Sequence, residues 1–109
     1  MAVSNLKSTM HQFGRDTVDV IKQDIRYKKL IRTGDLLGSI TYQLYERNGD
    51  IEVDFFMISY GKYVDEGTKY IKARDFFKDN INKQVIKWQQ DISDAVSKDI
   101  EQDIQKIFK

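Results

Sequence analysis

Few residues in this sequence have the type and spacing that catalysis or metal binding requires. His11 is the only histidine and there is no cysteine, so a metal centre or a general base at His11 would lack the usual partners. Asp65 and Glu66 form an adjacent carboxylate pair that could bind a metal, but the spacing of a calcium-binding loop is missing. No phosphate-binding glycine loop or nucleophile elbow occurs. We therefore predict no catalytic residue, no cofactor and no metal, and a protein that is not an enzyme.

A local basic cluster is the other feature that could carry chemistry. It comprises Lys22, Arg26, Lys28, Lys29 and Arg32. Phosphate binding is one interpretation, and a solvated helix end is the other, because cations are favourable near a helix C-terminus. The whole chain has 18 basic and 17 acidic side chains and a net charge of +1, which argues against a dedicated nucleic-acid-binding protein. We favour the helix end.

Length and composition indicate one globular domain, residues 1–109. Hydrophobic residues make up 40% of the chain and charged residues 32%, too apolar a mixture for a disordered tail. No apolar run approaches the ~18 residues of a membrane span, and the N-terminal residues lack the layout of a signal peptide. The absence of cysteine suits a cytosolic origin. We expect a soluble protein with no membrane contact.

The first half of the chain predicts a helix followed by a hairpin. Apolar residues repeat at helical steps from about Ser4 to Lys28, although Gly14 should weaken the middle of this helix by roughly 1 kcal/mol relative to alanine. A connector follows, in which Thr33 or Asp35 could cap a short helical turn. Two alternating segments, residues 40–45 and 51–58, predict strands. Asn48-Gly49 between them is the pair that best forms a tight hairpin turn.

The second half predicts a loop and one long helix. Periodicity is lost between residues 60 and 72, where we expect a structured loop with one helical turn, and a third strand could lie within residues 68–72. From about Ala73 to the end, apolar residues recur every three or four positions. They are Phe77, Ile81, Val85, Trp88, Ile92, Val96, Ile100, Ile104 and Ile107. About 36 helical residues would extend ~54 Å, so the helix either bends or packs its far end on another subunit.

These elements predict an α+β fold: a small antiparallel sheet packed by an N-terminal helix and a long C-terminal helix. Two strands alone make a marginal sheet, and a neighbouring chain could supply further pairing. Tyr60, Tyr63 and Tyr70 lie close together in the loop. Tyrosine suits protein interfaces because it combines a large apolar ring with a polar tip. The sequence leaves open whether these tyrosines form an interface or close the end of the sheet internally.

Two segments of the chain resemble a known family. The first runs from Leu30 to Ile40 and contains Thr33-Gly34-Asp35-Leu36 followed by Ser39-Ile40. The second contains Tyr60-Gly61-Lys62-Tyr63-Val64-Asp65-Glu66-Gly67-Thr68, followed by Ala73-Arg74-Asp75-Phe76. Their patterns, order and spacing are similar to those of the tail-component family of long-tailed bacteriophages, which includes neck, tail-completion and head–tail joining proteins. The resemblance covers roughly residues 25–90. The family usually has prolines around the Ala-Arg pair, where Lys72 and Asp75 stand here.

The resemblance implies a structural virion protein of the head–tail junction. Such proteins assemble as homo-oligomeric rings that join the head connector or head-completion protein to the tail tube or terminator, with the genome passing through the lumen without specific binding. The implied location is the virion neck or tail, and the host cytoplasm during assembly. The implied subunit and partner contacts are Tyr60, Gly61, Tyr63, Val64, Asp65, Glu66, Gly67, Thr68 and Arg74.

Within this loop we expect the residues to have different structural roles. Gly61 and Gly67 would permit tight turns. Tyr63 and Val64 would hold the loop on the sheet, with Asp65, Glu66 and Thr68 facing outward. Gly67→Val is then expected to leave a folded monomer that cannot build the ring. The alternative function is a small non-enzymatic protein-binding or regulatory module of a mobile element, which docks a partner through its amphipathic C-terminal helix.

Overall fold

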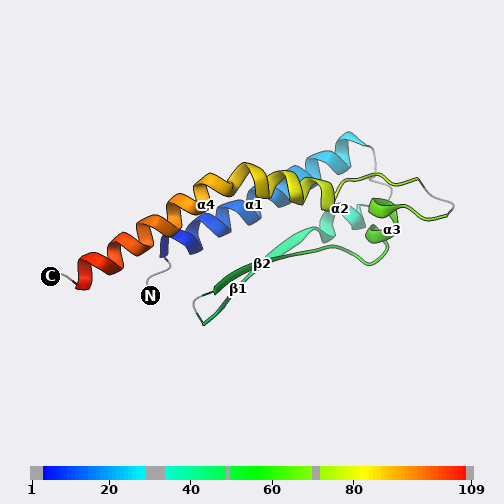
Figure 1. Cartoon of the computed structure of the whole chain (residues 1–109). Helices are drawn as coiled ribbons and strands as arrows, with labels where there is room; N and C mark the ends of the chain where they lie inside the picture. Colours follow the sequence, from blue (N-terminus) through cyan, green and yellow to red (C-terminus); the bar gives the residue numbers. More distant parts are fainter. Residues whose placement is uncertain (1–3, 29–33, 49, 70–71, 108–109) are drawn as a thin grey trace.

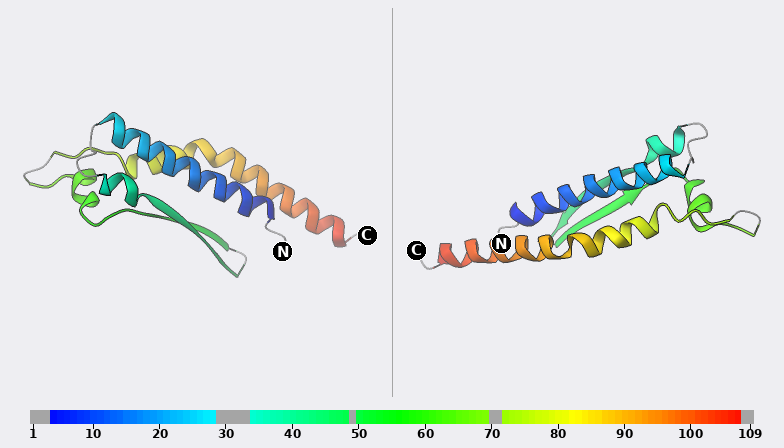
Figure 2. Two further views of the ribbon diagram at one scale, coloured as in Figure 1. Left: turned by 180° about the vertical axis from the view of Figure 1, so that it is seen from behind. Right: turned by 90° about the horizontal axis from the view of Figure 1, so that it is seen from above.

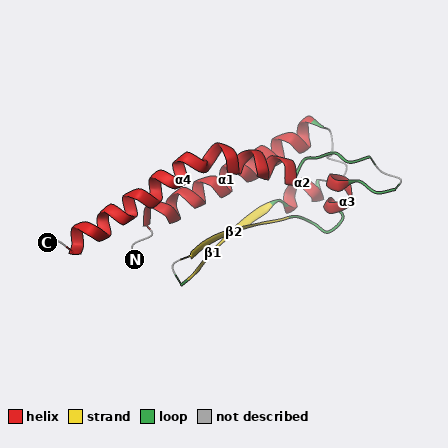
Figure 3. Cartoon of the chain, viewed as in Figure 1, coloured by secondary structure: helices red, strands yellow, loops and turns green. Residues whose placement is uncertain are grey.

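The computed structural model describes residues 4–28, 34–48, 50–69 and 72–107, and the side chains as far as residue 102. Two long antiparallel helices lie side by side, and a β-hairpin covers one side of the pair (Figure 1). The elements are α1 (Ser4–Tyr27), α2 (Asp35–Ser39), β1 (Thr41–Arg47), β2 (Asp50–Phe56), α3 (Gly61–Glu66) and α4 (Lys78–Ile107). The predicted α+β fold is confirmed. The short helices and loops gather at one end of the molecule (Figure 3).

The hairpin forms as the alternation predicts. β1 and β2 pair antiparallel, from Thr41 opposite Phe56 to Arg47 opposite Asp50. Asn48 has a φ of 52°, the left-handed conformation that a tight hairpin turn demands; Gly49 lies outside the described residues. No third strand is found among residues 68, 69 and 72, and residues 70–71 of that prediction are not described. Both strands of the described sheet therefore keep a free edge.

α1 packs directly on the hairpin because a glycine lies at the crossing point. A Cβ atom on Gly14 would lie 2.5 Å from Cδ2 of Tyr42, so this position must be glycine for the Tyr42 ring to lie against the helix. Phe13 continues the contact and packs edge-on against Phe55 at 5.8 Å between ring centroids. Glycine therefore stands at position 14, despite its cost within a helix, because α1 and the hairpin approach closely there.

Polar side chains fasten α1 to α4 at both ends. Asp99 of α4 is 2% exposed and accepts hydrogen bonds from the backbone N of Asn5 (3.0 Å) and Leu6 (2.9 Å), and from Asn5 Nδ2 (3.0 Å). The two backbone N–H groups lie in the first turn of α1 and have no hydrogen-bonding partner within that helix. At the other end, Asn80 Nδ2 donates to Asp24 Oδ2 at 2.8 Å. Between the two, the indole of Trp88 donates to Asp16 at 3.1 Å.

Burial by itself would raise the pKa of Asp99. The hydrogen bonds from α1 outweigh it, and the pKa of this carboxyl lies below its usual value of 3.8. Asp99 is therefore a charged side chain in the contact between the helices, stabilised by the N-terminus of the neighbouring helix.

α4 begins at Lys78 and not near Ala73 as predicted. Asp75 has a φ of 49°, which interrupts any helix passing through it and which a proline ring cannot adopt. Its backbone N donates to the carbonyl of Asp65 at 3.1 Å, a bond that proline could not make. The helix therefore starts only beyond Asp75.

The buried face of α4 is displaced from the predicted apolar face. Val85 and Ile100 are exposed, although the pattern places them in the core, whereas Asn80, Gln84 and Asp99 are buried. These polar residues are buried because each has a hydrogen-bonding partner on α1, on α4 itself or on both. The charged face of the helix is exposed as expected, at residues 83, 87, 91, 94 and 98.

The molecule is elongated. Its principal extents are 63 × 23 × 22 Å and its radius of gyration is 17.3 Å, whereas a compact domain of this length has about 13 Å. α4 extends past the N-terminal end of α1 (Figures 1 and 2). Beyond Asp99, its last eight residues run on for about 12 Å at the helical rise. Among the described residues, no helix has the length and apolar character needed to cross a bilayer.

Candidate functional site

The loop that the sequence singled out folds into α3 and the segment before α4, at the end of the molecule opposite the chain termini (Figure 1). The one helical turn expected there is confirmed as α3. Gly61 starts this helix and is buried. A Cβ atom on it would lie 2.7 Å from Met57 Sδ and 2.9 Å from Leu36 Cδ1. Gly61 is thus required by close packing, and not by the tight turn that was predicted.

Gly67 ends α3 in a conformation that side chains with a Cβ rarely adopt. Its φ is 78° and its ψ is 172°, and its backbone N donates to the carbonyl of Tyr63 at 2.9 Å. The predicted turn at this glycine is confirmed. Valine at this position would strain the loop itself, so a loss of assembly in Gly67→Val would not distinguish a lost contact from a distorted loop. An exposed residue is needed to test assembly.

Asp65 faces inward, contrary to the prediction that it faces outward. It is 3% exposed, and its carboxylate accepts hydrogen bonds from the backbone N of Phe77 (2.8 Å) and Lys78 (3.3 Å). These groups belong to the N-terminal end of α4, so Asp65 caps a helix that lies twelve residues further along the chain.

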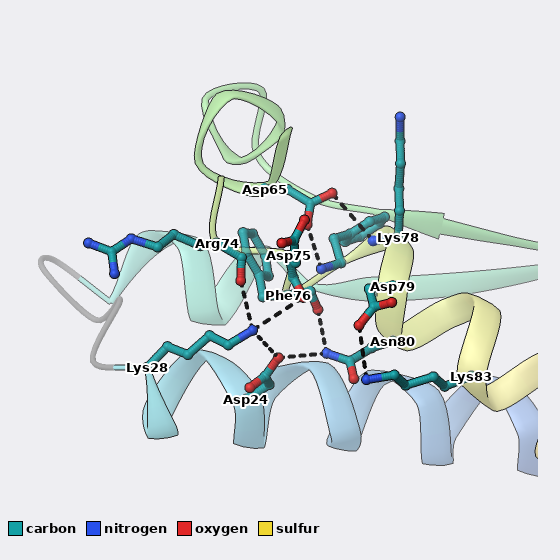
Figure 4. A network of polar contacts seen from close by, with 11 residues as sticks. Asp24, Lys28, Asp65, Arg74, Asp75, Phe76, Lys78, Asp79, Asn80 and Lys83 are labelled. Carbon is teal, nitrogen blue, oxygen red and sulfur yellow. Dashed lines mark hydrogen bonds and ion pairs between the residues drawn. The ribbon is translucent and has the colours of Figure 1, made fainter. Parts of the chain in front are cut away.

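Further contacts make the loop, α1 and the start of α4 one connected unit (Figure 4). The backbone N of Arg74 donates to the carbonyl of Val64 at 3.0 Å. Lys28, at the end of α1, donates from Nζ to the carbonyls of Arg74 (2.7 Å) and Asp75 (3.2 Å) and pairs with Asp24 at 3.0 Å. One member of the basic cluster is therefore used internally, while Lys29 and Arg32 lie outside the described residues.

The exposed part of the loop is aromatic. Tyr63 is 57% exposed, so it does not hold the loop on the sheet as predicted; Val64 does, because it packs against the core. Tyr60 and Phe56 are each 42% exposed beside it. We call Phe56, Tyr60 and Tyr63 the aromatic corner. Phe56, Tyr63, Lys62 and Phe77 are among the residues that line a shallow hollow of ≈ 550 Å³ there. Exposed aromatic side chains around a hollow are suited to binding protein.

The remaining residues of the predicted contact set lie on the surface of the same unit. Glu66 pairs with Lys78, and the hydrogen bond from this lysine lowers the pKa of Glu66. Thr68 and Arg74 are exposed, and the Arg74 guanidinium points away from the network (Figure 4). The set therefore divides into Tyr60, Tyr63, Glu66, Thr68 and Arg74, which a partner can reach, and the residues that shape the loop.

The geometry brings no reactive groups together among the described residues. Asp65 and Glu66 point to different partners, so the carboxylate pair does not converge. His11 shares a hydrogen bond of 3.2 Å with the Tyr42 hydroxyl. No group of three or more acidic or histidine side chains in the described part of the chain is placed to hold a metal ion. What the arrangement offers is a rigid, partly aromatic surface.

Sequence reasoning missed Phe56 and the strongly exposed Ile86 of α4 as surface residues. Phe56 breaks the alternation of β2, because it lies on the side of the strand that carries Glu52 and Asp54, and this irregularity was the available signal. Ile86 lies between two apolar positions of the predicted core face and gave no signal. Comparison with family models, with curated proteins and with solved structures finds no match to this chain.

Proposed function

We propose that this chain is a structural subunit of the head–tail junction of a long-tailed bacteriophage, a neck or tail-completion protein that assembles as a ring. The ring would join the head connector to the tail tube, with DNA passing through its lumen. The first support is the resemblance of the two sequence segments to the tail-component family. Most of both segments, from Gly34 to Ile40 and from Tyr60 to Phe76, belongs to the described residues and lies in one end of the fold.

The observation that carries the proposal is that some residues of the loop fix its conformation while others are exposed to solvent. Gly61, Asp65 and Gly67 are held by packing, by the cap of α4 and by a positive φ. Tyr60 and Tyr63, on the same short helix and its N-cap, face solvent. A loop that is fixed internally and displays aromatic rings loses little conformational entropy when a partner binds. This suits a permanent protein contact better than a reaction that needs convergent polar groups.

The test is deletion of the gene from an infective genome that carries it. The expected result is DNA-filled heads and separate tails in electron micrographs of lysates, and joined particles when the wild-type chain is supplied from a plasmid. Complementation by Tyr63→Glu should fail, while Glu101→Lys, on the exposed charged side of α4, should restore joining. Normal yields of joined virions from the deletion would refute the assignment.

A second candidate function has one specific observation in its favour. Ile86 of α4 is 72% exposed, as expected for a helix that docks on a partner in a small regulatory module. This alternative predicts that the purified chain stays a monomer or dimer and binds one protein of the host or the mobile element. Retention of a single stoichiometric partner, without any effect on head–tail joining, would favour it.

A further inference from the structure

Two separate exposed apolar surfaces occur on this chain. The first is the aromatic corner. The second, which we call the α4 stripe, runs along the outer side of α4 and consists of Val85, Ile86, Gln89, Ser93, Val96 and Ile100. Of its large apolar residues, Val85, Ile86 and Ile100 are strongly exposed. Tyr27 is the only strongly exposed large hydrophobic residue of the described side chains that lies outside these two surfaces.

The α4 stripe carries no charge. Positions 85, 89, 93, 96 and 100 follow one another at steps of four and three, so they share one face of the helix over about 22 Å. The charged residues of the same stretch, at positions 83, 87, 91, 94 and 98, follow a different face. Burying an unpaired charge against the stripe would be costly, so its occupant must be an uncharged, largely apolar surface.

The aromatic corner has this chemistry. Its three rings are apolar, and the two tyrosine hydroxyls can hydrogen-bond to the Gln89 and Ser93 side chains within the stripe. Lys62 is the charged side chain that lines the adjacent hollow. Its long stem allows the ammonium group to remain in water at the rim of a contact.

The surface area of the chain fits a subunit with two separate contacts. Its accessible surface is 7705 Å², whereas a compact monomer of 12.9 kDa has about 6,300 Å². The excess of about 1,400 Å² reflects the elongated shape of the chain. Two contacts that each bury about 800 Å² of one subunit would need a comparable area.

We propose that the aromatic corner of one copy of this chain docks on the α4 stripe of a second copy. The aromatic corner lies at the α3 end of the molecule, and the stripe runs along α4 from Val85 to Ile100 (Figure 1). The contact joins two different surfaces, so each copy offers one surface of each kind, and the association repeats until rotation closes it into a ring. The inference rests on the proposed ring and specifies the contact that builds it.

The test uses one charge placed on each surface of the full chain. Tyr63→Glu and Ile86→Glu alter exposed side chains, so both variants should keep the melting temperature of the monomeric wild type. Each alone should remain a 12.9 kDa monomer in light scattering at concentrations where the wild type forms larger particles. Mixed in equal amounts, the two variants should form a 1:1 dimer that grows no further, because only one intact pair of surfaces remains. Lys98→Glu, on the charged face of α4, is the control and should assemble like the wild type.

Each other outcome overturns the proposal. A mixture that stays monomeric would mean that the surfaces do not recognise one another. Either variant alone assembling like the wild type would mean that its surface is not used, and a wild type that is monomeric at all concentrations would exclude the contact. The result is separable from the head–tail role. If both variants restore joining to a phage that requires the gene, the proposed contact between copies is wrong and the head–tail role stands. If the mixed dimer forms but deletion of the gene has no effect on joining, the contact stands and the head–tail role is wrong.

Discussion

Gly14→Ala tests how closely the hairpin and α1 approach one another. The new Cβ would lie 2.5, 2.7 and 2.9 Å from three carbons of the Tyr42 ring, whereas ordinary contacts of this kind are at 3.4–4 Å. The ring must therefore move by about 1 Å, and overpacking of this kind costs about 1–3 kcal/mol. Alanine offsets about 1 kcal/mol of this by favouring the helix. The net expectation is a loss of up to about 2 kcal/mol.

Gly38→Ala is the matched control for this substitution. Gly38 lies in α2 and does not have a positive φ, and a Cβ atom added to it would meet no other atom within 4 Å. The same chemical change should therefore stabilise the chain by about 0.5–1 kcal/mol, because alanine only restricts the unfolded state. The two variants should therefore differ in stability by about 0.5–3 kcal/mol, with Gly14→Ala the less stable. Each kcal/mol corresponds to about 4–8 °C in melting temperature for a domain of this size.

Thermal denaturation followed by circular dichroism, at a concentration where the chain is monomeric, measures the difference. Repeating Gly14→Ala in a Tyr42→Val background removes the ring that the methyl group meets. The penalty should then fall by at least about 1 kcal/mol, a coupling typical of residues in direct contact. If Gly14→Ala is as stable as Gly38→Ala, or if the Tyr42 background leaves its cost unchanged, the packing described for α1 on the hairpin is incorrect.

Three other substitutions test the polar contacts of the interior. Asp65→Ala removes the cap of α4 and should cost about 1–2 kcal/mol in urea denaturation, whereas Glu66→Gln, at the exposed neighbour, should have little effect. Asp99→Asn should cost a similar amount at neutral pH. Because the folded pKa of Asp99 is lower than its unfolded value, its contribution to the stability of the fold is complete above about pH 4 and is lost as the pH falls through the folded pKa. Asp99→Asn should therefore weaken the loss of stability at acid pH. An unchanged loss would contradict the hydrogen bonds that Asp99 accepts from α1. Thr17→Val should raise stability by about 1 kcal/mol, because the buried Thr17 hydroxyl has no hydrogen-bonding partner in the described part of the chain; a fall would contradict its assigned environment.

The elements that depend on local pattern could be predicted from the sequence. The alternation and the Asn48 turn specify the hairpin, and the apolar repeat specifies α1 to within one residue of its end. The helical turn of α3 lies within the stretch between residues 60 and 72 where the sequence loses its periodicity. In each case the information lies within a few neighbouring residues.

The parts that depend on distant partners could not be predicted. The start of α4 is set by Asp65 and by the positive φ of Asp75, and neither is visible in an apolar repeat. The rotation of α4 follows from Asn80 and Asp99, which are buried because α1 supplies their hydrogen bonds. For the same reason the pattern could not show that Asp65 points inward and Tyr63 outward. These side chains decide which surface remains for a partner.

The central claim is that this chain is built to assemble with copies of itself, and native mass spectrometry over a range of concentrations tests it most directly. We predict that the 12.9 kDa chain gives way, as concentration rises, to one closed oligomer of a single subunit number, and that Tyr63→Glu prevents this. A wild-type chain that remains a monomer over the whole range, with or without connector and tail-tube proteins, would contradict the claim.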